Sequence, residues 1–295
     1  MPIDKTVGVI GIGLMGEPMA RNLINAGYTV RIFTRTKSKA EKLIANGAQW
    51  CDSAAAVASE ADVVITIVTD SPDVEAVYLG ENGVCAGLRS GMLCIDMTTI
   101  SPEVARRVAV EVGKRGGGFL DAPVSGGRTG AEAGTLAIMV GGSESDVARA
   151  KPIFDVLGAN SVHCGAVGNG QITKLCNQIL CGLNLLAVSE AMAFAKRNGL
   201  DLNTMLSVVT KGAAGSWALE NLGRRMIDRD FAPMFMIDLQ QKDLRLTLEN
   251  ARMNKVPLPG TALVHQLLAV NQAAGEGREG TQALAKTLER MAGLE

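Results

Sequence analysis

The chain has little histidine and few aromatic residues. Its 295 residues include two histidines, two tryptophans and two tyrosines, and aromatic residues make up only 3% of it. A histidine acid or base therefore has few candidates, and no group of Cys, His and carboxylates has the spacing of metal ligands. We interpret His163 as closing a strand and His265 as lying on a late helix, and we predict no metal site.

Paired cysteines and an export signal are also missing. None of the six cysteines forms a C-x-x-C pair, and several lie in apolar runs where a thiol behaves as a small hydrophobe; they are Cys51, Cys85, Cys94, Cys164, Cys176 and Cys181. The opening "MPIDKTVGVIG" enters a strand-like run directly, without a charged and then apolar signal region. We therefore expect a reducing compartment and a cytoplasmic protein.

No excess of positive charge is present. Lys and Arg number 29 against 30 Asp and Glu, which gives a net charge of −1. Such a balance excludes a basic field for nucleic acid or an anionic membrane. The uncharged stretch after Lys174, residues 175 to 189, is shorter than the roughly 20 apolar residues that span a bilayer. We expect small-molecule partners, with no nucleic acid and no membrane.

What the chain does have is two kinds of periodicity. Up to about residue 163, short apolar runs alternate with helical patterns: "VGVIG", "TVRIFT", "DVVITIV", "MLCIDM", "GFLDAPV", "LAIMVGG" and "NSVHCG". This alternation is typical of βαβ units and a mostly parallel sheet. Residues 171 to 292 are helical in pattern almost throughout. We predict an α/β fold with a Rossmann domain over residues 1–164, an all-helical domain over 165–295, and a long helix from about residue 168 that joins them.

A glycine-rich turn between the first strand and the first helix indicates a dinucleotide. Strand "VGVI" runs into "GIGLMG" and a helix follows, so Gly11, Gly13 and Gly16 take the three glycine positions of the fingerprint. The first allows the tight turn, the second the close approach of a pyrophosphate, and the third the packing of helix on strand. We assign the loop, with Ile12, Leu14 and Met15, to the cofactor.

The end of the second strand indicates which dinucleotide binds. NAD sites usually place Asp or Glu there for the ribose 2′-hydroxyl, whereas this chain has Thr34, Arg35 and Thr36. Arg35 can form a charge-assisted pair with a 2′-phosphate, and the threonines offer hydroxyls. The alternative is an ordinary solvated face at a helix start. We predict a preference for NADP(H), with NAD(H) as the second choice.

A single lysine stands on a polar stripe of the long helix. Spacing of i, i+3 and i+4 places Lys174 on one face with Asn177, Gln178, Cys181 and Asn184. A lysine that snorkels from a helix end is the alternative. Against it, the flanking glycines indicate that a ligand or another backbone comes close. A partly desolvated ammonium there can bind a substrate carbonyl and give up its proton as hydride arrives.

A second glycine-rich stretch, "DAPVSGGRTGAEAGTL", follows strand "GFL". The run Ser125, Gly126 and Gly127 exposes successive backbone N–H groups and one hydroxyl, which suits a carboxylate. A glycine turn that merely joins two strands would have the same sequence.

The motifs "GIGLMG", "DAPVSGG", "GAVGNGQITKLCNQ" and "KDL", in this order, resemble the β-hydroxyacid dehydrogenases over nearly the whole chain. That family includes 3-hydroxyisobutyrate dehydrogenase, tartronate semialdehyde reductase and the glyoxylate/succinic semialdehyde reductases. The resemblance implies that Lys174 is the catalytic acid/base and that the Ser125 loop binds the substrate carboxylate. It also implies the following contacts: Lys242 of "KDL", Thr99 of "DMTTI", and Val68 and Thr69 with the cofactor, and Asn177 and Gln178 with the substrate.

Departures from the family pattern bear on the substrate. Thr69 stands where the family often has Pro, and Gln178 where many members have Asn. The string "KLCNQ" is similar to the tartronate semialdehyde reductase branch, which implies NADPH-dependent reduction of a short semialdehyde acid by a homodimer or homotetramer. Glyoxylate/succinic semialdehyde reductase and 3-hydroxyisobutyrate or 4-hydroxybutyrate-type dehydrogenase are the nearer alternatives. A non-catalytic dinucleotide-binding module is the alternative of another class.

Overall fold

The computed structural model describes residues 6–294. The chain divides into two compact units, Met1–Lys174 and Leu175–Glu295. The helix α9 (Asn169–Arg197) contains the point of division, so the first six residues of this helix belong to the first unit and the rest to the second.

The first unit is built on a nine-stranded sheet in the order β3-β2-β1-β4-β5-β6-β8-β7, with β9 paired to β8. Strands β3, β2, β1, β4, β5 and β6 are mutually parallel, and so are β8 and β9, whereas β8 runs antiparallel to β6 and β7. The strands are β1 (Thr6–Ile10), β2 (Thr29–Phe33), β3 (Gln49–Trp50), β4 (Val63–Thr66), β5 (Leu93–Asp96), β6 (Gly118–Asp121), β7 (Val124–Ser125), β8 (Leu136–Gly141) and β9 (Gly158–Gly165).

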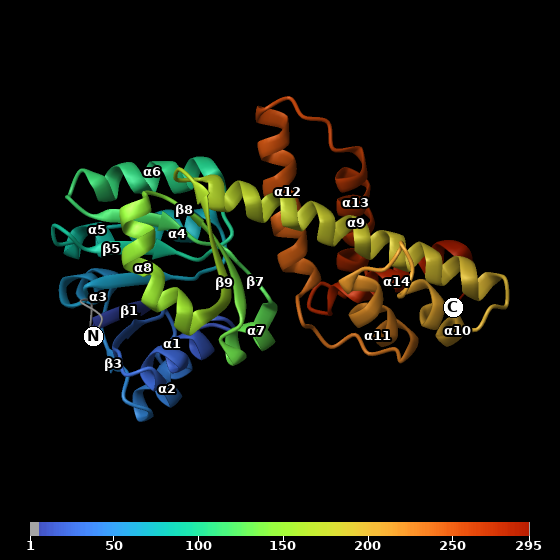
Figure 1. Ribbon diagram of the computed structural model, residues 1–295, viewed down its shortest axis with the longest axis horizontal. Coiled ribbons are helices and arrows are strands. Elements are labelled where there is room, and N and C mark those ends of the chain that lie inside the picture. The colour runs from blue at the N-terminus through green and yellow to red at the C-terminus, as the bar shows by residue number, and fades with distance from the viewer. Residues whose placement is uncertain (1–5, 295) are drawn as a thin grey trace. The chain divides into compact units, whose positions relative to one another are not determined.

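Helices cover both faces of this sheet, as the continuous apolar strands predict. Alternate residues of β4 point to opposite faces: Val63 and Ile65 belong to one core cluster and Val64 to the other. Figure 1 shows α6 on one side of the sheet and α1 on the other. The helices of this unit are α1 (Gly16–Asn25), the 3₁₀ turn η1 (Lys37–Ala40), α2 (Glu41–Ala45), α3 (Ala54–Glu60), α4 (Ser71–Leu79), α5 (Val84–Gly87), α6 (Pro102–Gly113), α7 (Gly127–Ala133) and α8 (Glu144–Leu157).

The second unit is helical and has a core of its own. Leu185 and Met192 of α9 pack with Leu222, Leu244 and Leu268 in one cluster. Its other elements are α10 (Leu202–Val209), the π-helical turn η2 (Ala218–Leu222), α11 (Gly223–Ile227), α12 (Ile237–Met253), α13 (Pro259–Ala273), the 3₁₀ turn η3 (Thr281–Ala283) and α14 (Leu284–Ala292).

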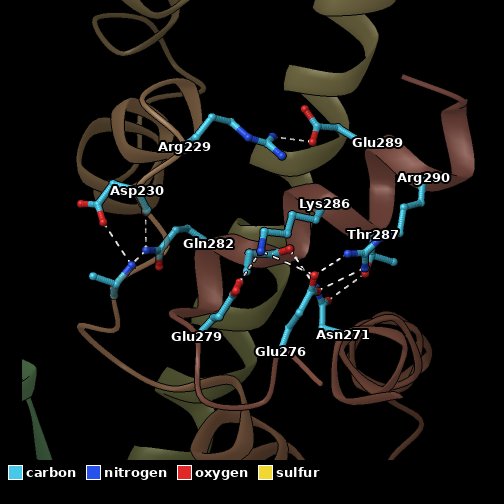
Figure 2. A network of polar contacts seen from close by, with 12 residues as sticks. Arg229, Asp230, Asn271, Glu276, Glu279, Gln282, Lys286, Thr287, Glu289 and Arg290 are labelled. Atoms are coloured by element: carbon cyan, nitrogen blue, oxygen red, sulfur yellow. Dashed lines mark hydrogen bonds and ion pairs between the residues drawn. The ribbon is translucent and has the colours of Figure 1, made fainter. Parts of the chain in front are cut away.

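A polar network joins α13, η3 and α14 beside this core (Figure 2). Glu276 is its centre: it accepts hydrogen bonds from Asn271 and from Arg290 and lies 3.5 Å from the Lys286 ammonium. The same ammonium lies 4.4 Å from the ring centroid of Phe231. The buried carboxylate of Glu276 is therefore paired with two partly buried cations inside this unit.

The predicted fold class is confirmed, including the long helix, which begins at Asn169. Two short strands at the ends of sheet pairings, β3 and β7, were not predicted from the sequence. By length and composition α9 is apolar enough to cross a membrane, and half of its most apolar 18-residue window is buried in the protein. Core helices of globular proteins have the same properties.

Candidate functional site

The candidate site residues of the first unit gather at one edge of the sheet. Because β1, β4, β5 and β6 are parallel neighbours, their carboxyl ends lie side by side, where ligands of open α/β sheets bind. Backbone hydrogen bonds extend this order into the turns: Ile67 N donates to Ile10 O, and Met97 N donates to Thr66 O.

The glycine loop has the geometry that a dinucleotide requires. Gly11 has φ of +101°, and a Cβ there would overlap the carbonyl oxygen of Ile67. A Cβ on Gly16 would overlap the carbonyl oxygen of Gly11, so helix α1 and the loop are in backbone contact. Gly13 is exposed and its Cβ would meet nothing within 4 Å. The space beside the loop is therefore open at Gly13, which is the fingerprint glycine that lets a pyrophosphate approach the backbone.

A pocket of about 430 Å³ lies against this loop. Its wall includes Gly13 and Leu14 of the loop together with Lys39, Lys42 and Arg128, as well as two glutamates. Positive side chains beside a helix N-terminus suit the phosphates of a dinucleotide. The loop and pocket thus fit NAD(P).

Arg35 follows β2 and is 82% exposed. Its guanidinium lies 3.3 Å from the carboxylate of Asp73, near the start of α4. Gly11 N donates to Phe33 O, which ties the end of this strand to the glycine loop. Arg35 is available on the surface at the place where the adenosine ribose lies in this fold.

A buried carboxyl group, Asp96, organises the turns after β4 and β5. Its Oδ1 accepts from the hydroxyls of Thr66, at 2.7 Å, and Thr98, at 2.8 Å. The Thr98 hydroxyl in turn accepts from Val68 N at 3.0 Å. Burial raises the pKa of Asp96 to about 7, against the opposing effect of these hydroxyl bonds. The Asp96 carboxyl group therefore holds both Val68, through the Thr98 hydroxyl, and the segment that contains Thr99.

A second buried carboxylate, Asp121, holds the start of α9. Its Oδ1 accepts from Gly168 N at 2.7 Å and its Oδ2 accepts from Gln171 N at 2.9 Å. The side chain therefore satisfies amides that the first helical turn leaves free. Burial raises the pKa of Asp121 to about 6, although the two backbone bonds favour its ionised form.

Two glycines, Gly170 and Gly141, lie where the start of α9 approaches the strand ends most closely. A Cβ on Gly170 would overlap the carbonyl oxygen of Met139, and a Cβ on Gly141 would overlap the Asp121 carboxylate and come within 2.8 Å of Gly170 N. Of the glycines that flank Lys174, for which a ligand or another backbone was predicted to come close, Gly170 meets a backbone, whereas a Cβ on Gly168 would come within 2.9 Å of the Arg106 side chain. The helix can approach the strand ends closely only without these side chains.

Lys174 lies one turn after this anchored start. It is 6% exposed, which is far lower than expected for a lysine that snorkels into solvent. Gln171, three residues earlier on the same helix face, is wholly buried. The structure therefore ties the candidate acid to the edge of the sheet where the glycine loop lies.

The Ser125 loop joins β7 to α7. Gly126 and Gly127 both have positive φ, at 130° and 60°, and Gly126 is exposed. Successive residues of this kind aim backbone N–H groups at one point, which suits an anion. The turn leads into a helix, so the alternative of a turn between two strands is wrong.

In the second unit, another predicted group surrounds a buried acid on α12. Asp243 Oδ2 accepts from Gln178 at 2.6 Å, and its Oδ1 lies 2.9 Å from the Lys242 ammonium. The Gln178 carbonyl accepts from Asn177, whose amide also lies 3.4 Å from Cys181 Sγ. Three members of the predicted stripe are thus in contact.

Sequence reasoning missed the residues that hold the site in place. Asp96 and Asp121 each end an apolar strand, and Asp243 lies within "KDL", so an acid at the end of a buried run was the available signal. Gln171 had none, because a polar residue at a helix start is ordinary. His163 in β9 contacts the carbonyl oxygens of Gly142 and Gly165, as expected of a structural residue. Among the described residues, no group of three or more Cys, His, Asp or Glu could hold a metal ion.

Comparisons with known proteins agree with this geometry. The chain matches the model of the NAD binding domain of 6-phosphogluconate dehydrogenase over residues 6–165, and that of the NAD-binding region of NADP-dependent 3-hydroxyisobutyrate dehydrogenase over residues 168–288.

Relatives match over nearly their full length. The 2-hydroxy-3-oxopropionate reductase of Escherichia coli is 43% identical over 97% of this chain and 98% of its own. The 3-hydroxyisobutyrate dehydrogenase of Pseudomonas aeruginosa is 37% identical over 93% of this chain and 94% of its own. The solved 3-hydroxyisobutyrate dehydrogenase of Mycobacterium tuberculosis with L-serine superimposes with a TM-score of 0.90 at 34% identity, covering 96% of this chain and 99% of that one.

Proposed function

This chain belongs to the β-hydroxyacid dehydrogenase family, as a 3-hydroxyisobutyrate dehydrogenase-like NAD(P)-dependent oxidoreductase, and on that premise we propose that it uses NADPH to reduce a short semialdehyde acid to the hydroxy acid. The best candidate is tartronate semialdehyde, which is 2-hydroxy-3-oxopropionate. The observation that carries the proposal is the burial of Lys174 on a helix anchored at the strand ends beside the glycine loop.

The protein's own groups divide the work in this proposal. Nicotinamide, when bound at the glycine loop, supplies the hydride. The hydroxyl of Ser125 and the N–H groups of Gly126 and Gly127 hold the substrate carboxylate, which fixes the aldehyde carbon in position. The Lys174 ammonium donates a hydrogen bond to the carbonyl oxygen and transfers its proton as negative charge develops there.

The choice of NADPH rests on the end of β2. Arg35 and Thr36 are exposed after this strand, and no acid follows it where an NAD site places one. Arg35 would exchange its exposed pairing with Asp73 for a 2′-phosphate, which is a stronger acceptor.

The tartronate semialdehyde assignment is supported by the "KLCNQ" string and by the Escherichia coli relative of that activity. A 3-hydroxyisobutyrate dehydrogenase activity is the second candidate, because relatives of that name match over the same length. We also propose that the protein acts in the cytoplasm, on its unpaired cysteines, and as a homodimer or homotetramer, on the resemblance to the family.

A substrate panel tests the proposal. Initial rates of NADPH and NADH oxidation are measured with tartronate semialdehyde, glyoxylate, succinic semialdehyde and methylmalonate semialdehyde. We expect the highest kcat/KM with tartronate semialdehyde and NADPH. A higher value with methylmalonate semialdehyde would assign the second candidate. Tight NADPH binding without turnover of any aldehyde would contradict an enzyme and support a non-catalytic module.

A further inference from the structure

We propose that Gln171 is a positioning residue that locks the segment Thr98–Ile100 to the helix that carries Lys174. The inference rests on the proposed function, because it concerns how the acid and the cofactor segment keep their relative position. Gln171 has no part in the expectations drawn from the sequence.

Both ends of the Gln171 amide are used. Its Oε1 accepts from Ile100 N at 3.0 Å, and its Nε2 donates to Thr98 O at 2.8 Å. The side chain is wholly buried, so water cannot replace these partners. The side-chain amide therefore donates to and accepts from the backbone of the segment after β5, as a neighbouring strand would.

The backbone of Gln171 is held as firmly as its side chain. Its N–H donates to Asp121 Oδ2, and Asp121 ends the neighbouring strand β6. The residue is thus bonded at its main chain to the end of β6 and at its side chain to the turn after β5. Lys174 follows it by one helical turn.

The segment on the other side of the lock leads to the cofactor loop. Thr98 bonds Asp96 and accepts from Val68 N, and Thr99 is the residue assigned to the nicotinamide ribose. A shift of Thr98–Ile100 would therefore move Val68 and Thr99 relative to Lys174. Misplacement by about 1 Å can cost on the order of a hundred-fold in rate.

Only an amide of this length satisfies the geometry. A glutamate keeps the acceptor for Ile100 N and loses the donor for Thr98 O. A methionine has nearly the same shape and neither hydrogen-bonding group, so it leaves both backbone partners buried and unsatisfied. Gln171→Met is therefore the test variant, and Gln171→Glu replaces it if the methionine variant does not fold.

A matched control exists in the second unit. Asn271 is also a wholly buried amide; it donates to Ala283 O at 2.8 Å and accepts from the Thr287 hydroxyl at 2.9 Å (Figure 2). Asn271→Leu removes these two bonds, and the bond to Glu276, from a residue with no assigned role in the reaction. Both variants should lower the thermal midpoint.

The measurements are kcat, the KM of the aldehyde and the dissociation constant of NADPH. In Gln171→Met we expect kcat to fall about ten-fold or more, because the acid is misplaced, while the NADPH dissociation constant rises less than about three-fold. Asn271→Leu should keep kcat within about two-fold. Equal losses of kcat in the two variants, or an unchanged kcat in Gln171→Met, would overturn the proposal.

Amide hydrogen exchange tests the lock without any substrate. In Gln171→Met, peptides that contain Ile100 and the first turn of α9 should lose protection, whereas Asn271→Leu should leave them unchanged. If the wild type turns over none of the aldehydes, the proposed function fails and this exchange result still decides whether the lock exists. Unchanged protection at Ile100 would show that it does not.

Discussion

Asp96 is a buried acid whose pKa the fold raises to about 7. Its Oδ1 takes all three of its described bonds, from Thr66 and from the hydroxyl and N–H of Thr98, while its Oδ2 has no partner among the described residues. Asp121 ends the neighbouring strand and adds electrostatic repulsion. A carboxyl group in this setting favours its protonated form.

Asp96 should make stability depend on pH. Its pKa is about 7 in the folded protein and near its usual 3.8 when unfolded, so folding takes up a proton between these values. The contribution of protonated Asp96 to the free energy of unfolding is fully present below about pH 4 and is lost as the pH rises through 7. We expect the difference in unfolding free energy between wild type and Asp96→Asn to shrink by a few kcal/mol from pH 5 to pH 8. Urea unfolding measures it, and a difference independent of pH would contradict the buried acid.

Arg35 gives a test of cofactor choice. We expect Arg35→Ala to raise the KM for NADPH about ten-fold and the KM for NADH less than about two-fold, because only NADPH carries the 2′-phosphate. Initial rates with varied cofactor measure both constants. Arg107→Ala is the control, since Arg107 is also an exposed arginine paired to a carboxylate, that of Glu75. Equal effects on the two cofactors in Arg35→Ala would refute the assignment.

The candidate ligand-binding residues were easier to propose from the sequence than the residues that hold them in place. The glycine loop stands out because its three glycines lie between a strand and a helix. Lys174 stands out because it is a single charge among glycines, amides and apolar residues. Asp121 and Gln171 act through backbone amides that are distant in sequence, 47 to 73 positions away. Sequence periodicity carries no information on such pairs.

At the scale of elements, helix α9 depends on close backbone approach at its first turn. A Cβ on Gly170 would overlap Met139 O and come within 2.8 Å of the Asp121 carboxylate. Farther along the same helix, a Cβ on Gly182 would meet Leu244 and Val264 at 3.5 Å, which is ordinary contact. Close backbone contact therefore requires glycine at position 170, whereas the space at position 182 would accept a methyl group.

This contrast predicts opposite effects of alanine. Gly170→Ala should destabilise the protein by roughly 2 kcal/mol or more, because backbone oxygens cannot move away. Gly182→Ala should be neutral or stabilise by up to about 1 kcal/mol, since alanine favours the helix. Chemical unfolding of both variants compares them. A Gly170→Ala variant as stable as wild type would contradict the described start of α9.

The order of elements followed from the sequence because strand and helix periods differ clearly. The strands β3 and β7 were not predicted, because two residues are too few to show a strand period. The antiparallel placement of β8 beside β6 and β7 was also out of reach, because the strand pattern alone does not give direction.

At the scale of the whole molecule, the pKa shifts of the two units predict opposite responses to acid. Burial raises the pKa values of Asp96 and Asp121 in the first unit. In the second, the pKa values of Glu276 and Glu289 are lowered: burial opposes this, but bonds from Arg290 and Arg229 outweigh it (Figure 2). The first pair loses stability as pH rises, and the second loses it as pH falls.

Calorimetry at pH 7, 5.5 and 4 should separate these responses. The midpoint of the first unit should rise from pH 7 to 5.5, and that of the second should fall below about pH 4.5, the ordinary value for Glu276. Glu276→Gln identifies the second transition, because it weakens the bonds from Arg290 and Lys286. Midpoints that move together over this range would contradict the assignment.

Lys174 is the group on which the account depends, and its replacement is the most direct test. Turnover of NADPH with the best aldehyde is compared in wild type, Lys174→Ala and Lys196→Ala, which removes an exposed lysine near the end of the same helix. We expect Lys174→Ala to lower kcat by about 10²-fold or more with NADPH affinity nearly unchanged, and Lys196→Ala to keep kcat within about two-fold. A Lys174→Ala enzyme that turns over at the wild-type rate would contradict the proposed acid.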